Sequence, residues 1–190
     1  MVEHFDFMLH KPVHCVSQFI NNNRRKKTVL GDLYDFPEGT MAIGRLDADT
    51  EGLLLLTTDG KFSQEVRSNA YEKEYWVQVH GQVNELALRK LKEGVTITVG
   101  SEDYLTKPAK VELHTDVDAI PPNPRKERDP RHGPKTWIKI IISEGKNRQV
   151  RKMTAAVGHP TLRLIRWRIG NITLKGMAAS EVKVLNRSLL

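Results

Sequence analysis

The sequence predicts a chain that combines α-helices with β-strands, and three patterns lead to this fold class. Apolar and polar residues alternate at 95–99 and again at 138–142, which is the period of a half-buried strand. At 84–94, apolar residues recur instead at helical spacing. Four consecutive leucines at 53–56 stand between turn residues, a pattern typical of a strand buried on both faces and shared by short helical segments.

The first seventy residues contain further local signals. Residues 5–9 favour a strand. The basic run Arg24 to Lys27 fits a solvated loop or helix end, with a phosphate contact as its functional alternative. Phe62 and Val66 lie four residues apart, which predicts a short helix after the turn at 59–60.

A capped helix is expected over 84–94. Asn84 is a residue type that caps helix N-termini, and Gly94 is one that ends helices. Ala87, Leu88 and Leu91 would form the buried stripe between them.

Residues 144–160 predict a strand that turns into a helix. Val150, Met153 and Val157 would form an inward stripe, and the segment 158–160 would end the helix. Lys152 lies off that stripe, so we expect it on an exposed basic face.

The composition limits the possible partners. The formal net charge is +7 with 30 Lys and Arg residues, which favours polyanions such as nucleic acid without proving one. The single cysteine, Cys15, excludes an internal disulfide and suggests a reducing compartment. Neither a signal-like N-terminus nor a run of ~20 apolar residues is present, so we expect a soluble, cytoplasmic protein without membrane contact.

The same survey indicates chemistry without a metal or cofactor. The seven histidines lack the paired spacing of zinc ligands. Neither a Gly-rich phosphate loop nor a dinucleotide fingerprint occurs. The chemistry should therefore be cofactor-free.

Asp47 is the most informative acidic residue, and three interpretations compete for it. It could simply cap a turn, since Asp, Thr and Gly cluster around it. Asp47, Asp49 and Glu51 also match the first half of a calcium loop, but the twelfth position holds Thr58 instead of a bidentate Glu. The third interpretation is catalytic, because Arg45 adds a positive charge that would keep the carboxylate ionised and nucleophilic.

Three sequence blocks then indicate a family. They are GRLDADTEGLLLLTTDG at 44–60, KEYWV at 73–77 and EGKNRQVRKM at 144–153, and they occur in this order. Each resembles the corresponding block of the pseudouridine synthases that modify bacterial ribosomal RNA. The resemblance continues through 158–166 and covers the chain from Phe7 to about Val184.

This resemblance implies an α+β fold. The expected architecture is a central, mainly antiparallel mixed sheet with flanking helices and two subdomains, 1–70 and 71–190, around a catalytic cleft. Residues 1–190 would form one catalytic domain without the separate N-terminal RNA-binding domain of many members. In this respect the chain looks most like the compact members that modify 23S rRNA, and we expect it to act as a monomer on ribosomal RNA without cofactor or metal.

The resemblance also implies residue roles. Asp47 would be the nucleophile, and Arg45 would fill the space left by a flipped uridine. Tyr75 shares a strand face with Val77 and Val79, so a core position is its plain interpretation. The family pattern places its hydroxyl against the uracil to remove the C5 proton. Arg151 would form an ion pair with Asp47.

The remaining basic residues of the blocks are expected to bind RNA. This group contains Lys146, Arg148, Arg163 and Arg166, and Arg168 belongs to the same set of candidate phosphate ligands. The segment 121–135 has five prolines and five Lys or Arg residues, which predicts a long loop. It is either a disordered surface connection or, in our hypothesis, a loop that closes over bound RNA.

Two other classes of function are compatible with these residues. A non-catalytic RNA-binding or ribosome-assembly protein would keep the scaffold and the basic surface without turnover, and a synthase could act on a different RNA. A metal-dependent nuclease using Asp47, Asp49 and Glu51 would explain the clustered carboxylates.

Overall fold

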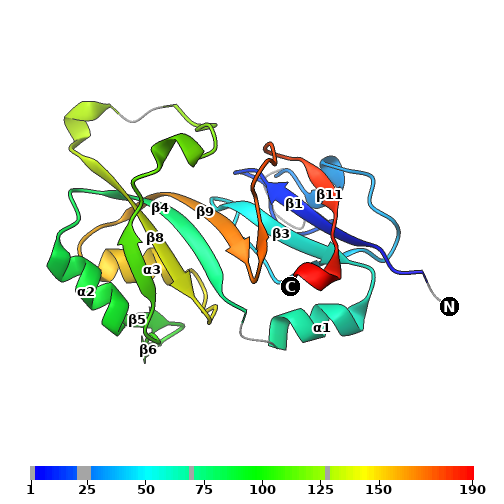
Figure 1. Cartoon of the computed structure of the whole chain (residues 1–190), viewed down its shortest axis with the longest axis horizontal. Coiled ribbons are helices and arrows are strands. Elements are labelled where there is room, and N and C mark those ends of the chain that lie inside the picture. Colours follow the sequence, from blue (N-terminus) through cyan, green and yellow to red (C-terminus); the bar gives the residue numbers. More distant parts are fainter. Residues whose placement is uncertain (1–2, 21–26, 69–70, 127–128) are drawn as a thin grey trace. The chain divides into compact units, whose positions relative to one another are not determined.

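The computed structural model describes residues 3–20, 27–68, 71–126 and 129–190. The chain divides into two compact units (Figure 1). The first unit contains Met1–Tyr71 and Arg166–Leu190, and the second contains Glu72–Ile165. The sequence predicted subdomains 1–70 and 71–190, and the structure differs in placing the C-terminal 25 residues with the first unit. The reason is strand pairing, since Val184 lies opposite Phe7.

The first unit is built around an antiparallel sheet. Strand β3 pairs with all six residues of β1 through Gly52–Thr57 and also with the short β2, and β1 pairs on its other side with β11. The elements of this unit are β1 (Asp6–Lys11), β2 (Met41–Ile43), β3 (Glu51–Thr57), α1 (Gly60–Ser68), β10 (Ile172–Thr173), β11 (Val182–Val184) and the 3-10 helices Leu30–Asp32 and Arg187–Leu189. Every residue of β3 is buried, which confirms the predicted strand with two covered faces.

The second unit contains a group of antiparallel strands and the helices α2 and α3. Strand β8 pairs antiparallel with β4 on one side and with β7 on the other, while β5 and β6 form a separate hairpin. The elements are β4 (Lys73–His80), α2 (Glu85–Glu93), β5 (Thr96–Val99), β6 (Glu102–Leu105), β7 (Lys110–Leu113), β8 (Lys135–Ile142), α3 (Gln149–Ala156) and the 3-10 helices Val117–Ala119 and Pro130–His132. Strand β9 (Thr161–Ile169) begins in this unit and ends in the first, where it pairs with β10.

The core of the second unit lies on one face of its sheet. Ile138, Ile140 and Ile142 of β8 point into it, as their alternation predicts. They meet the buried stripe of α2 and the residues Val150 and Met153 of α3. Helices therefore flank an antiparallel sheet, which confirms the α+β class.

Helix α2 has the ends that the sequence predicts. The Asn84 side chain accepts a hydrogen bond from the Ala87 amide at 2.9 Å, so it is the N-cap. At the other end Gly94 has φ +106, and a Cβ there would lie 2.4 Å from the Thr106 carbonyl oxygen. This close approach explains why the residue after α2 is glycine.

The proline-rich loop at 121–135 is partly ordered by its neighbours. The Arg163 guanidinium donates hydrogen bonds to the carbonyls of Pro121 and Pro122 at 2.9 and 3.1 Å, and Arg131 forms an ion pair with Asp129 at 2.7 Å. Residues 127–128 of this loop, and Arg24 to Lys26 of the N-terminal basic run, lie outside the described residues.

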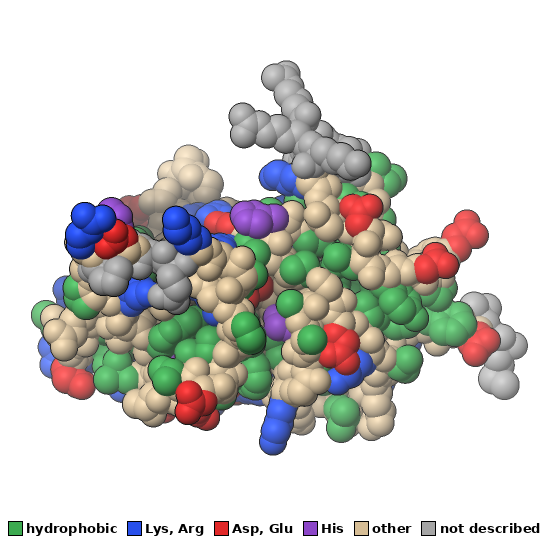
Figure 2. Space-filling model, turned by 90° about the horizontal axis from the view of Figure 1, so that it is seen from above, with side chains coloured by type: hydrophobic (Ala, Val, Ile, Leu, Met, Phe, Trp, Pro, Cys, Tyr) green, Lys and Arg blue, Asp and Glu red, His purple; other side chains and the backbone are tan. Residues whose placement is uncertain are grey.

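Two surface properties complete the description. On the face shown in Figure 2, basic and acidic side chains are interspersed, so the net charge of +7 is not gathered in one continuous patch there. Within the described part of the chain, no helix has the length and apolar character needed to cross a membrane.

Candidate active site

The loop that carries Asp47 connects β2 to β3 and is fixed by backbone hydrogen bonds. The Ser17 hydroxyl donates to the Leu46 carbonyl at 2.9 Å and accepts from the Leu46 amide at 3.0 Å. The His14 amide donates to the Ala48 carbonyl at 2.7 Å, and the Thr50 amide donates to the carbonyl of Asp47 itself at 3.0 Å. Asp47 is therefore held between two anchored neighbours, which limits the positions that its carboxylate can reach.

Strands β3 and β9 approach each other closely next to this loop, at Gly52 and Arg166. Gly52 has φ +118, and a Cβ at this position would lie 2.4 Å from the Arg166 carbonyl oxygen of β9. Only glycine fits without displacing backbone. The crossing also brings the buried Arg166 guanidinium against β3, where its Nε donates to the Leu53 carbonyl at 2.8 Å.

Lys11 is an unexpected member of this site. Its side chain is fully buried, and its ammonium donates to the carbonyls of Pro12 and Cys15 at 2.9 and 2.6 Å. Burial lowers the pKa of Lys11 to about 8, an effect that Cys15, Glu51 and Asp47 oppose and that Arg166 reinforces.

Two cations and two carboxylates therefore share the buried end of β1 and β3. Lys11, Glu51, Asp47 and Arg166 lie close enough for their charges to influence the pKa of the lysine. Sequence patterns did not identify Lys11 as part of a site, and they indicated Glu51 only as a possible metal ligand. The available signal was that Lys11 continues an apolar strand and stands opposite Gly52 in it, but a pattern alone does not reveal that a lysine is buried.

Tyr75 lies in the core of the second unit. It is 8% exposed and belongs to the same cluster as Val77 and Val79, which confirms the predicted shared face. In the sheet it stands opposite Ile140 of β8.

The third sequence block forms a tight turn and the start of α3. Lys146 and Arg148 are exposed, and Arg151 is half-buried in the first turn of the helix. Arg148 is the residue before α3 and has φ 52, the left-handed conformation that is uncommon for arginine. The Lys146 ammonium lies 4.6 Å from the centre of the Tyr104 ring.

The two arginines of β9 are buried, in contrast to Lys146 and Arg148. Arg163 is 4% exposed, binds the proline-rich loop through two carbonyls and lies over the Trp137 ring at 5.9 Å. Arg166 is 5% exposed. Roles for Arg163 and Arg166 as RNA ligands remain predictions.

The predicted site residues are thus divided between the two units. The first unit holds Arg45, Asp47 and Arg166, and the second holds Tyr75, Lys146, Arg148, Arg151 and Arg163. Within the first unit, Asp47 and Arg166 are brought to the same buried lysine.

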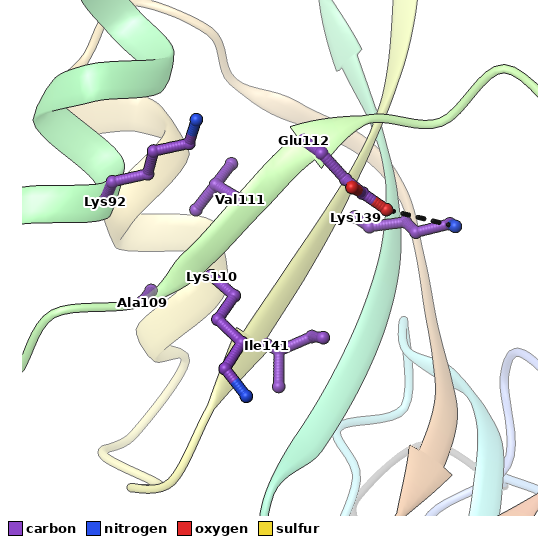
Figure 3. A pocket seen from close by; sticks show the side chains of 7 residues that line it. All are labelled: Lys92, Ala109, Lys110, Val111, Glu112, Lys139 and Ile141. Carbon is purple, nitrogen blue, oxygen red and sulfur yellow. Dashed lines mark ion pairs between the residues drawn. The ribbon is translucent and has the colours of Figure 1, made fainter.

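A cavity of about 440 Å³ in the second unit is lined by other residues (Figure 3). Its lining consists of Lys92, Ala109, Lys110, Val111, Glu112, Lys139 and Ile141. Two of its lysines have acidic partners, since Lys139 pairs with Glu112 at 3.2 Å and Lys110 with Glu72 at 2.5 Å. The predicted site residues do not line this cavity.

Comparison with known protein families shows to which family this chain belongs. Residues 5–156 match the family described as RNA pseudouridylate synthase. The chain belongs to that family. The match includes the Asp47 loop, Tyr75 and the third block, so the predicted family and its isomerase class are confirmed.

Individual relatives agree with this membership. The chain is 40% identical over 181 residues to ribosomal large subunit pseudouridine synthase E of Vibrio vulnificus, covering 94% of the chain and 74% of the relative. It is 39% identical over 173 residues to the synthase E of Xanthomonas axonopodis, covering 90% and 88%. A crystal structure of a pseudouridylate synthase matches with a TM-score of 0.77 and 32% identity, over 99% of this chain and 73% of the other.

Proposed function

We propose that this pseudouridine synthase converts a uridine of 23S ribosomal RNA to pseudouridine, without a cofactor and with Asp47 as the nucleophile. The supporting observation is that the family block around Asp47 folds into a loop anchored through Leu46 and Ala48. The choice of RNA rests on the two relatives described above, which are named ribosomal large subunit pseudouridine synthase E. Residues 1–190 would act as a single catalytic domain and as a monomer in the cytoplasm.

The reaction breaks the N1–C1′ glycosidic bond and forms a C5–C1′ bond in the same nucleotide. Three routes use one carboxylate: attack of Asp47 on C1′, its attack on C6, or removal of the 2′ proton to give a glycal. In each route the uracil turns within the site before it is joined again. Loss of the proton from C5 then restores the conjugation of the ring, and N1 gains a proton in place of its bond to C1′, so substrate and product contain the same atoms.

The charges of Lys11 and Asp47 interact within the first unit, since Asp47 is one of the groups that oppose the lowering of the lysine pKa by burial. In the proposed mechanism Arg151 would add an ion pair to Asp47, as the family pattern implies. Opposite charges favour the anionic form of an acid, which is the form that can act as a nucleophile. A fixed polar surrounding also stabilises charge in the transition state without reorganising.

Tyr75 would accept the C5 proton, directly or through a water molecule. Its burial on β4 excludes most solvent from the phenol, and the residues around it in the core hold the ring in place. Replacement by Phe separates this role from packing, because only the hydroxyl is lost. If the Tyr75→Phe variant retains turnover, Tyr75 contributes only to packing.

RNA would bind mainly through exposed cations. Arg45, Lys146 and Arg148 are exposed, and Arg45 would occupy the stack left by the flipped uridine. Flipping costs a few kcal/mol, which contacts with the extruded base offset. Arg163 would contribute by holding the proline-rich loop beside the RNA, and Arg166 by holding β9 against β3.

Tritium release from C5-labelled uridine in a 23S rRNA transcript tests the proposal. The parent chain should release tritium, and Asp47→Asn should not. Asp49→Asn is the matched control, because it makes the same change two residues away in the same loop and should retain release. Adding a chelator should not change the rate of tritium release by the parent or by Asp49→Asn.

Other outcomes would support the competing functions. RNA binding without tritium release from any transcript would indicate a non-catalytic RNA-binding protein. Release from a different RNA would change the substrate but not the reaction. Chelator-sensitive cleavage that is lost equally in Asp47→Asn and Asp49→Asn would indicate a nuclease.

A further inference from the structure

Glu144 is the centre of a hydrogen-bond network that joins three segments of the second unit. Its Oε2 accepts from the Tyr104 hydroxyl of β6 at 2.5 Å, and its Oε1 accepts from the Lys107 amide at 3.0 Å. The same Oε1 accepts from the Gln149 side-chain amide at the start of α3. One carboxylate thereby ties the β5–β6 hairpin to the first residue of the helix.

Gln149 transmits this connection to the turn before the helix. Its side-chain oxygen accepts from the Lys146 amide at 2.9 Å, and the side chain is 3% exposed. A second tie lies one turn along, where the Lys152 ammonium donates to the Thr98 carbonyl of β5 at 2.7 Å. The first turn of α3 is thus attached to the hairpin at both ends.

The attachment of Gln149 fixes the positions of the residues around it, Arg148 before it and Arg151 after it. Arg148 is held in its left-handed conformation between the anchored Lys146 and Gln149. Arg151 lies two residues beyond Gln149 in the same turn, so the rotation and height of that turn determine where its guanidinium points. Breaking the Tyr104 bond would allow the turn to shift while the hydrophobic stripe of α3 stays buried.

We propose that Tyr104 and Glu144 are positioning residues that hold Arg151 in its working orientation, and that the β5–β6 hairpin is their rigid support. The inference rests on the proposed function, in which Arg151 pairs with the nucleophile. The hydrogen bond also holds the pKa of Tyr104 above and that of Glu144 below the ordinary values, which is the expected sign for a phenol donating to a carboxylate. The phenol therefore remains a donor at neutral pH.

The test uses Tyr104→Phe, which removes the donor and keeps the ring beneath Lys146. We expect kcat for tritium release to fall roughly tenfold, the loss typical of one hydrogen bond to a charged group, while KM for RNA changes less than twofold. Tyr34→Phe is the matched control, since it removes the hydroxyl of a tyrosine that is 45% exposed in the first unit, and it should leave kcat unchanged. Glu144→Gln provides a second variant if Tyr104→Phe does not fold.

A double-mutant cycle separates positioning from general stability. In an Arg151→Lys background, removing the Tyr104 hydroxyl should cost less than twofold, because the side chain that it orients is already altered. The fraction of protein that binds RNA, measured by titration, should equal that of the parent in every variant.

The remaining outcomes contradict the inference in distinguishable ways. An unchanged kcat in both Tyr104→Phe and Glu144→Gln would overturn it, as would full additivity with Arg151→Lys. A fall in kcat matched by an equal fall in the RNA-binding fraction would show that the network only stabilises the fold. If the parent chain itself releases no tritium, the proposed function fails and this inference fails with it.

Discussion

The buried ammonium of Lys11 leads to a prediction about stability and pH. The pKa of Lys11 falls from 10.5 in the unfolded chain to about 8 in the folded one. Between these pH values the unfolded chain holds a proton that the folded chain has lost, so the free energy of unfolding rises with pH. At about 1.36 kcal/mol per pH unit, the full rise is about 3 kcal/mol.

Substitution Lys11→Met removes this rise. Methionine has a similar length and no charge, so the variant should gain none of the roughly 3 kcal/mol between about pH 7.5 and pH 10.5. Its loss of the hydrogen bonds to Pro12 and Cys15 shifts the stability by an amount that does not depend on pH. The slope against pH therefore isolates the titration of the lysine.

Urea denaturation at several pH values measures the slope. The Cys15 thiol complicates the same range, because burial raises its pKa and so lowers stability as pH rises through its folded value. Both chains should therefore carry Cys15→Ala. If the difference between parent and Lys11→Met stays constant from pH 7.5 to pH 10.5, the ammonium is not desolvated as the structure indicates, and the reasoning is wrong.

Three further substitutions test other parts of the fold. Gly52→Ala should lower the free energy of unfolding by about 3 kcal/mol or more, because its Cβ would meet the Arg166 backbone at a positive φ; an unchanged melting temperature would contradict the close crossing. Arg187→Met should lower stability at neutral pH, and the difference from the parent should become smaller as pH falls well below 3.8, since the Arg187 hydrogen bond lowers the pKa of Asp59; a difference that does not change with pH would contradict this. Asn84→Ala should cost about 1 kcal/mol in urea denaturation through loss of the α2 cap, and Asn84→Asp should largely restore it.

The local parts of the fold were predictable from the sequence. Helix α2 carries its cap, its stripe and its terminating glycine within eleven residues, and the structure reproduces all three. Strand β3 was predictable because its apolar run reflects burial on both sides. In each case the information lies within one element.

The elements that the sequence did not reveal depend on distant contacts. Strand β9 contains Arg163 and Arg166 at buried positions, which breaks the apolar pattern of a strand. Each arginine donates a hydrogen bond to a carbonyl far along the chain, at separations of 42 and 113 residues. The pairing of β11 with β1 is likewise non-local, which is why the boundary at 165/166 was missed.

The candidate site also contains residues that the sequence revealed and residues that only the fold reveals. Asp47, Tyr75 and Arg151 could be identified because they stand in recognisable blocks. Lys11 could not, since its role depends on its burial in three dimensions and on the charges of Glu51 and Arg166 that the fold brings near it. Glu144 was visible as part of a block, but its three hydrogen-bond donors come from segments that only the fold brings together.

The discontinuous first unit has a consequence for biosynthesis. Strand β1 leaves the ribosome before the whole second unit, yet its partner β11 and Arg187, which binds Asp6 and Asp59, leave after it. The second unit, in contrast, is one continuous stretch from Glu72 to Ile165 and can complete its sheet earlier. Translation of the unit that carries Asp47 therefore starts before that of the second unit and finishes after it, so the first unit cannot complete its strand pairing until the second unit has been made.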